Sequence, residues 1–329
     1  MKLELKAKGP VTDLKISPDG KLLAVVQRVA DADLSLLTIW STSMWKCINE
    51  IKSSNGVGIL TTSFNHDSDT LGFLSDDNIV RLLDVKKMEV FKEISVPVSE
   101  SIQFAKRKDL ILISGEDIRV YNTASGELIW KYDMYKAYQP TLRIPDDLLT
   151  NYYSIPGWIK NGSYRNAPAV AAFCGEDNHV IMTGKNDNMF SVFEISSGKC
   201  LKQFPGGVLQ AERLEIDPKE KYLFLISKIP DANLLWDLKT MERMLPKYLN
   251  DEYYGAPCFC FHPSSSFFAT GGKSGMVFLT DMKDGEFVMM EEVHKGEVYT
   301  LQFTSDGKTL ISGGSDGEVY LTDITGFVS

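Results

Sequence analysis

The chain has 329 residues, and 43% of them are hydrophobic, so it can bury a large core. Its formal charge of −9 argues against broad attraction to phosphate backbones or anionic lipid, and nucleic acid is not expected as a direct partner. No stretch approaches the roughly 18 apolar residues of a membrane helix, and the first ten residues lack the apolar core of a signal peptide. We therefore expect no membrane insertion and no secretion.

The cysteines are odd in number and thinly scattered, which is not the pattern of a disulfide framework. They are Cys47, Cys174, Cys200, Cys258 and Cys260. Free thiols are typical of proteins in reducing compartments. We therefore expect a cytoplasmic or nuclear protein.

The first predicted element in chain order is a strand at residues 2–8, where "KLELKAK" alternates apolar and polar side chains. Seven similar units follow it. Each begins with two short runs joined by a polar turn, as in "VTDLKISPDGKLLAVV" at residues 11–26. The turn residues Pro-Asp-Gly-Lys indicate a hairpin, because Asp caps its own backbone and Gly accepts positive φ.

A third run in each unit closes at one marker position, and a further turn and a fourth run come after it. The marker residues are Trp40, Leu83, Tyr121, Phe193, Trp236, Thr280 and Thr322. Five of their six intervals are near one period of about 43 residues, which is typical of a four-stranded propeller blade. The sequence therefore predicts an all-β, seven-bladed propeller that forms a single domain over residues 1–329.

The interval from Tyr121 to Phe193 breaks the period, because it is longer by about 30 residues. The excess falls between blades 3 and 4, at about residues 134–167. This segment is rich in aromatic side chains, and aromatic rings favour ordered contact over a disordered linker. Two interpretations stay open, a lid packed on the propeller and a docking element for a partner protein. The candidate partner-binding residues are Tyr135, Tyr138, Tyr152, Tyr153, Trp158 and Tyr164.

The last unit, at residues 293–324, resembles a repeat of the WD40 family, and the resemblance covers almost the whole chain. The family's pattern places a His before the first strand, a Ser on the second and an Asp in the next turn. Here these are His294, Ser312 and Asp316. The resemblance implies that they form a structural hydrogen-bond chain, not a catalytic triad. Thr322 stands where the family has Trp, so the hydrogen-bond chain is expected to lack its fourth member.

The last unit also lacks a fourth strand, since only six residues follow Asp323. Propellers of the WD40 family commonly close by borrowing a strand from the opposite terminus. The resemblance therefore implies that residues 2–8 form the outer strand of blade 7. It also implies that the insertion lies on the face around the narrow end of the central funnel.

No catalytic, cofactor or metal site is expected. Cys258, Cys260 and His262 alternate along one strand and could in principle approach a metal, but an inner strand buried between blades uses Cys as a small apolar residue. The basic run at residues 105–109 occupies a hairpin turn, where solvated charge is common.

The expected function is that of a non-catalytic scaffold, a subunit or adaptor of a larger assembly that binds other proteins through the insertion-bearing face. Two alternatives stay open. One is an enzyme with a metal or small ligand in the funnel, although the chain has no repeated inward-facing acidic position. The other is a phosphoinositide- or nucleic-acid-associated module, although the chain has no adjacent Arg-Arg pair.

Overall fold

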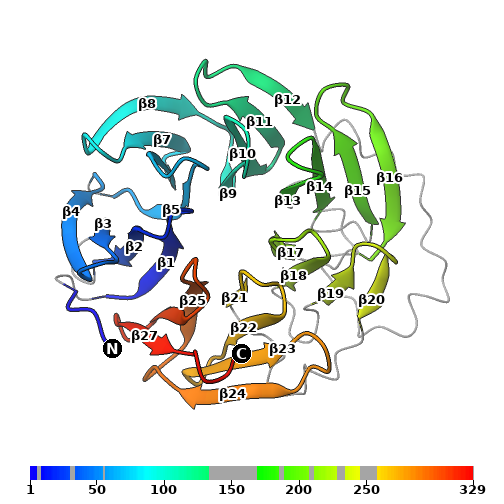
Figure 1. Ribbon diagram of the computed structural model, residues 1–329. Helices are drawn as coiled ribbons and strands as arrows, with labels where there is room; N and C mark the ends of the chain where they lie inside the picture. The colour runs from blue at the N-terminus through cyan, green and yellow to red at the C-terminus, as the bar shows by residue number, and fades with distance from the viewer. Residues whose placement is uncertain are drawn as a thin grey trace, which may run out of the picture.

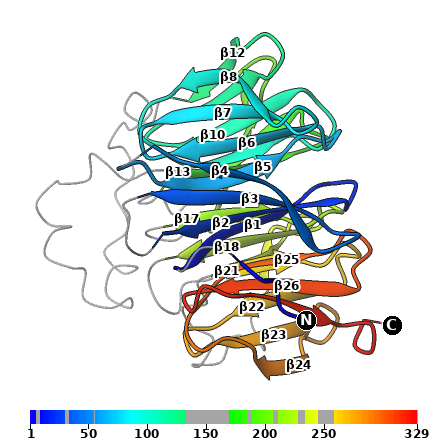
Figure 2. The same cartoon turned by 90° about the vertical axis from the view of Figure 1, so that its left-hand side faces the viewer.

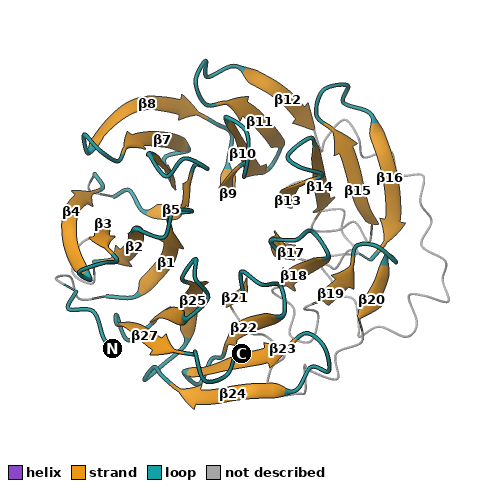
Figure 3. Cartoon of the chain, viewed as in Figure 1, coloured by secondary structure: helices purple, strands orange, loops and turns teal. Residues whose placement is uncertain are grey.

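The computed structural model describes residues 1–5, 9–29, 34–54, 56–132, 169–184, 189–206, 211–227, 234–244 and 258–328. Every regular element within these ranges is a β-strand, and the strands form seven sheets arranged around a central axis (Figure 1, Figure 3). The predicted all-β, seven-bladed propeller is confirmed. No apolar helix of bilayer-spanning length occurs among the described residues.

Each of the first six blades has four antiparallel strands in sequence order, and the seventh has three. Blades 1 to 4 contain β1 (Val11–Ile16), β2 (Leu22–Arg28), β3 (Ser35–Ser41), β4 (Lys46–Lys52), β5 (Ile59–Phe64), β6 (Thr70–Ser75), β7 (Ile79–Asp84), β8 (Glu89–Ser95), β9 (Ser99–Phe104), β10 (Leu110–Gly115), β11 (Ile118–Asn122), β12 (Leu128–Tyr132), β13 (Ala169–Cys174), β14 (His179–Gly184), β15 (Met189–Glu194) and β16 (Cys200–Pro205). Blades 5 to 7 contain β17 (Ala211–Ile216), β18 (Tyr222–Ser227), β19 (Leu234–Asp237), β20 (Glu242–Met244), β21 (Cys258–Phe261), β22 (Phe267–Gly271), β23 (Met276–Asp281), β24 (Phe287–Glu292), β25 (Val298–Phe303), β26 (Thr309–Gly314) and β27 (Val319–Asp323).

Burial depends on the position of a strand within its blade. The second strand of blade 1, β2, is buried over most of its length, because both faces of the sheet pack against neighbouring blades. The outer strand β4 has no buried residue and alternates between exposed and half-buried side chains. Strands that lie in the middle of a blade, such as β2, are therefore apolar over most of their length.

Apolar side chains fill the spaces between adjacent blades. Between blades 5 and 6, the ring of Phe224 stacks on that of Phe259 with centroids 3.6 Å apart. Between blades 1 and 2, Val26 and Ile39 share one buried cluster with Phe73. Because each blade is covered only by its two neighbours, the closed ring is the unit that buries the core.

Hydrogen bonds from side chains also connect the inner strands of successive blades. From blade 7 round to blade 4, each inner strand supplies a side-chain oxygen that accepts a backbone N–H of the next. The pairs are Thr300 Oγ1 with Leu14 N, Asp13 Oδ2 with Thr62 N, Ser63 Oγ with Phe104 N, and Gln103 Oε1 with Phe173 N. These bonds satisfy amides that face the central channel.

The turns between first and second strands fit closely against one another. Gly307, in the β25–β26 turn, has φ +70°. A Cβ atom at this position would lie 2.3 Å from Nε2 of His262 in blade 6. Both the backbone conformation and the neighbouring imidazole therefore favour glycine.

The ring closes where the N-terminal segment meets β27 (Figure 1, Figure 2). Lys2 forms an antiparallel bridge with Tyr320, and the Leu3 amide donates to the Val319 carbonyl at 2.9 Å. The segment therefore pairs with the strand that the sequence indicates, but the expected seven-residue strand is wrong in extent. The described pairing is one bridge with flanking hydrogen bonds, residues 4 and 5 are not in a strand, and residues 6–8 lie outside the described residues.

The long connection joins β12 to β13, between blades 3 and 4, as the sequence predicts. Residues 133–168 lie outside the described residues. The end of β12 and the start of β13 lie on the face where each outer strand connects to the next inner strand. We call it the insertion-bearing face.

Candidate functional site

The six aromatic residues predicted to bind a partner lie outside the described residues. They are Tyr135, Tyr138, Tyr152, Tyr153, Trp158 and Tyr164. Whether they form a lid or a docking element stays a prediction. The candidate site is therefore built from the described residues around the point where this connection leaves and rejoins the ring.

The structure brings His294, Ser312 and Asp316 together in blade 7. Nε2 of His294 lies 2.8 Å from Ser312 Oγ, and Nδ1 lies 3.0 Å from Asp316 Oδ1. Burial of Asp316 opposes its ionisation, but hydrogen bonds from His294 and from backbone amides lower its pKa overall. His294 is only 1% exposed, so a substrate cannot reach its ring. This geometry suits a structural role.

Thr322 does not extend the hydrogen-bond chain of His294, Ser312 and Asp316. It lies opposite Leu310 in the β26–β27 register, whereas Ser312 lies opposite Tyr320. The ring of Tyr320 meets His294 edge to face, with centroids 4.9 Å apart. Tyr320 therefore supplies apolar packing beside the imidazole.

Cys258, Cys260 and His262 do not share a metal-binding geometry. Nδ1 of His262 lies 2.7 Å from Ser264 Oγ and Nε2 lies 2.9 Å from the Gly307 carbonyl, so both ring nitrogens are engaged. Both cysteines are buried, and burial raises the pKa of Cys258 to about 12. Its thiol therefore stays protonated, which disfavours metal ligation. Among the described residues no cluster of His, Cys, Asp and Glu could hold a metal ion.

Two exposed apolar side chains lie on the insertion-bearing face, in blade 2 and in the connection from blade 2 to blade 3. Leu60, near the start of β5, is 42% exposed, and Val98, in the connection from β8 to β9, is 54% exposed. Asp76 and Glu100 are exposed near them: the Asp76 amide donates to Gly58, close to Leu60, and Glu100 follows Val98 by two residues. We call these four residues the Leu60–Val98 patch.

This patch combines what a protein interface needs at its centre and its rim. Exposed apolar side chains gain free energy when a partner covers them, and flanking carboxylates select a partner with basic residues. The sequence alone does not indicate the patch. Leu60 and Val98 look like ordinary strand and turn residues, and only the ring places them on one face.

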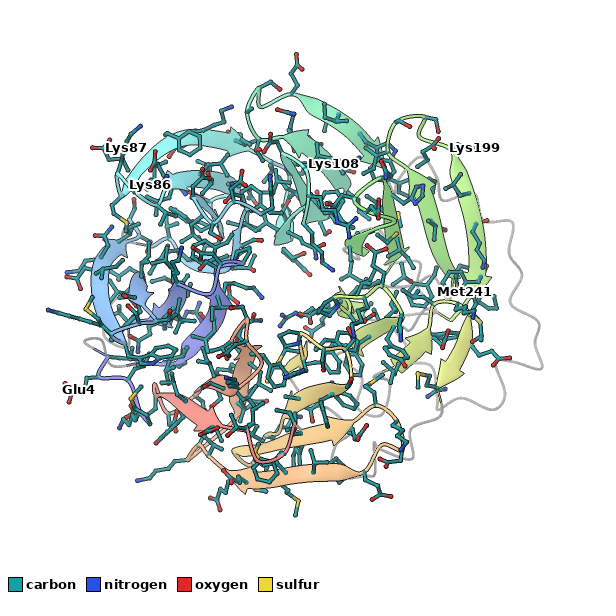
Figure 4. All side chains as sticks on the ribbon, viewed as in Figure 1. Glu4, Lys86, Lys87, Lys108, Lys199 and Met241 are labelled. Carbon is teal, nitrogen blue, oxygen red and sulfur yellow. The ribbon has the colours of Figure 1, made fainter. Side chains whose placement is uncertain are left out.

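The opposite face has a cleft of about 470 Å³ between blades 3 and 4. Leu110, Ile129 and Ile195 provide its apolar walls. Lys108 Nζ donates to Asn178 Oδ1 at 2.6 Å. Figure 4 shows Lys108 nearer the ring centre than Lys86, Lys87 and Lys199, which lie at the rim. The hydrogen bond joins blades 3 and 4 and uses one of the three donors of the ammonium.

The family comparison adds a finding about blades 6 and 7. The model described as "WD domain, G-beta repeat" matches residues 255–281 and 285–323. These ranges hold β21 to β27, including the His294 hydrogen-bond chain. Blades 6 and 7 are WD40 repeats, and the chain folds as a seven-bladed β-propeller. Its seven blades extend the architecture well beyond the matched repeats.

Known WD-repeat proteins are similar to parts of this chain. WD repeat-containing protein 91 of Gallus gallus is 37% identical over 93 residues, which is 28% of this chain and 12% of that protein. The protein of the same name in Bos taurus is 36% identical over 92 residues. WD repeat-containing protein SL1-17 of Schistosoma mansoni is 32% identical over 150 residues, or 44% of this chain and 48% of that protein.

These similarities are local. The match spans about an eighth of the length of the WD repeat-containing protein 91 relatives. WD40 propellers generally serve as protein-interaction scaffolds and are typically not enzymes.

Proposed function

We propose that this WD40 propeller is a scaffold subunit of a cytoplasmic or nuclear assembly and binds another protein through its insertion-bearing face. The observation that carries the proposal is the Leu60–Val98 patch, where apolar side chains 42% and 54% exposed lie beside carboxylates. An interface of this composition suits a segment with an apolar anchor and neighbouring lysine or arginine residues.

The experiment compares proteins captured from native cells by the wild type, by Leu60→Asp/Val98→Asp and by a matched control, Leu201→Asp. Leu201 is 46% exposed on the outer strand β16, so the control places one negative charge, half the charge of the double variant, on a comparable apolar side chain away from the patch. We expect at least one partner to bind the wild type and the control but not the double variant. Melting curves establish that all three proteins are folded.

A second variant tests the insertion separately. Residues 137–166 are replaced by a short Gly-Ser linker, and capture is repeated with the folded protein. Loss of the same partner assigns the insertion to the same interface. If neither the double variant nor the linker variant loses any partner, this face is not the binding surface.

A further inference from the structure

The cleft of about 470 Å³ between blades 3 and 4 has a volume typical of ligand pockets in proteins. Blade 3 contributes Lys108 of the β9–β10 turn and Ile129 of the outer strand β12. Blade 4 contributes Asn178 of the β13–β14 turn and Ile195, which follows β15. Lys108 lies nearer the ring centre than Lys199, which precedes β16 at the rim (Figure 4). The cleft therefore runs outward between the two blades.

The walls of the cleft are aliphatic. Ile195 is 7% exposed and belongs to the buried cluster between blades 3 and 4, and Leu110 packs against that cluster. Ile129 is 45% exposed, and it is the extra residue of the bulge in β12. A ligand side chain that covers Ile129 removes apolar surface from water, and this favours binding.

Lys108 supplies a half-buried cation at the inner end of the cleft. Its Nζ donates to Oδ1 of Asn178 at 2.6 Å, and this acceptor belongs to a neutral amide. Lys108 forms no ion pair within the part of the chain that the structure describes. An ammonium has three donors, so two remain for a ligand, and a carboxylate is the acceptor that best compensates the charge.

Two carboxylates also belong to the lining, but neither compensates Lys108. Asp177 is 2% exposed, and its Oδ2 accepts from the Arg107 amide at 2.6 Å. Glu194 accepts from the Ser197 hydroxyl at 2.5 Å. The residues before and after Glu194 both pack against blade 3, so the alternation of a strand directs the Glu194 side chain to the other face of the sheet. Lys108 therefore presents the charge that a ligand meets in the cleft.

We propose that this cleft binds an extended segment of a partner protein in which an aliphatic residue adjoins an aspartate or a glutamate. The aliphatic side chain packs between Ile129 and Ile195, and the carboxylate accepts from Lys108. The edges of the cleft are held in place before binding, because hydrogen bonds from Arg107 and Lys108 join the turns of the two blades. The cleft and the insertion-bearing face lie on opposite sides of the ring, so this site does not depend on the proposed function.

The experiment selects peptides from a phage-displayed library of random short sequences on the immobilised full chain. Peptides that also bind the variant Ile129→Asp are removed. Ile48→Asp is the matched control, because Ile48 is 45% exposed at the equivalent bulge of blade 1. Melting curves establish that each variant is folded.

We expect the remaining peptides to share an aliphatic residue next to an acidic one, and to bind the wild type and Ile48→Asp equally. Fluorescence anisotropy with the tightest peptide measures the affinities. Lys108→Met should weaken binding by about tenfold or more, the effect of losing one charge-assisted hydrogen bond. The control Lys86→Met, at the exposed rim, should bind like the wild type (Figure 4).

A double-mutant cycle tests the contact between Lys108 and the acidic residue of the peptide. Replacing that residue with its amide should weaken binding to the wild type by about tenfold but change binding to Lys108→Met little, because the two groups act as a pair. The proposal is overturned if no selected peptide distinguishes Ile129→Asp from Ile48→Asp. Losses that simply add in the cycle, or an unchanged affinity of Lys108→Met, also overturn it.

Discussion

At the scale of single residues, the carboxylate of Asp316 shows how one short side chain can connect two loops of a blade. It accepts from His294 Nδ1 and the Lys295 amide on one side, and from the Glu318 amide at 3.2 Å on the other. These bonds favour the charged form and outweigh the opposing effect of burial on its pKa. Asp316 therefore stabilises the folded state mainly as an anion.

Replacing Asp316 with Asn should lower the free energy of unfolding at pH 7 by about 1–2 kcal/mol, because a charged acceptor is lost. Since the folded pKa is depressed, the stabilisation is complete above the ordinary carboxyl pKa of about 4 and is lost as pH falls through the folded value. The difference between variant and wild type should therefore shrink in acid. Urea denaturation at several pH values measures it, with the exposed Glu291→Gln as control.

At the scale of elements, five outer strands share a β-bulge that their sequences do not reveal. In blades 1, 2, 3, 4 and 6 the pairing of the third and fourth strands shifts by one residue at an equivalent position. The extra residues are Ile48, Phe91, Ile129, Leu201 and Val288. A bulge interrupts the ladder at the open edge of a blade, which hinders pairing with the edge of another molecule.

The bulge residue of blade 3, Ile129, and its neighbour Trp130 have opposite surroundings. Ile129 is 45% exposed, whereas Trp130 is 7% exposed and packs against Phe193 of blade 4 with ring centroids 5.6 Å apart. Trp130→Ala should therefore cost about 3–5 kcal/mol of stability, and Ile129→Ala less than about 1 kcal/mol. Chemical denaturation of both variants measures the difference. Equal losses would show that Ile129 is also part of the core.

The sequence revealed features confined to one repeat more readily than features that several repeats share. His294, Ser312 and Asp316 lie within one repeat, so the resemblance of that repeat to the WD40 family implied that they form a hydrogen-bond chain. Leu60 belongs to blade 2 and Val98 to the connection between blades 2 and 3, and no local pattern places them on one face. The sequence did not predict the bulges either. One extra residue in a strand of mixed polar and apolar side chains leaves the repeat length of about 43 residues almost unchanged.

At the scale of the whole molecule, ring closure depends on a few residues at the N-terminus. The Leu3 amide donates to the Val319 carbonyl, and the Leu321 amide donates to the Met1 carbonyl. The side chain of Leu3 is 2% exposed and lies in an apolar cluster with Val319 and Leu321 of β27. This cluster also contains side chains of blade 1, so the segment contributes to the junction between the first and last blades. Because a propeller buries its core between blades, weakening this junction should weaken the ring as a whole.

Leu3→Asp should therefore lower the melting temperature by several degrees. It places a charge in the apolar junction and removes a buried side chain worth about 1.5–3 kcal/mol. Glu4→Ala is the matched control, because Glu4 is exposed on the same segment (Figure 4). Hydrogen exchange should show faster opening of β27 and β1 in Leu3→Asp, since both strands pack at the junction. If Leu3→Asp melts like the control, blades 7 and 1 hold together without the N-terminal segment, and ring closure rests on contacts such as the Thr300 to Leu14 hydrogen bond.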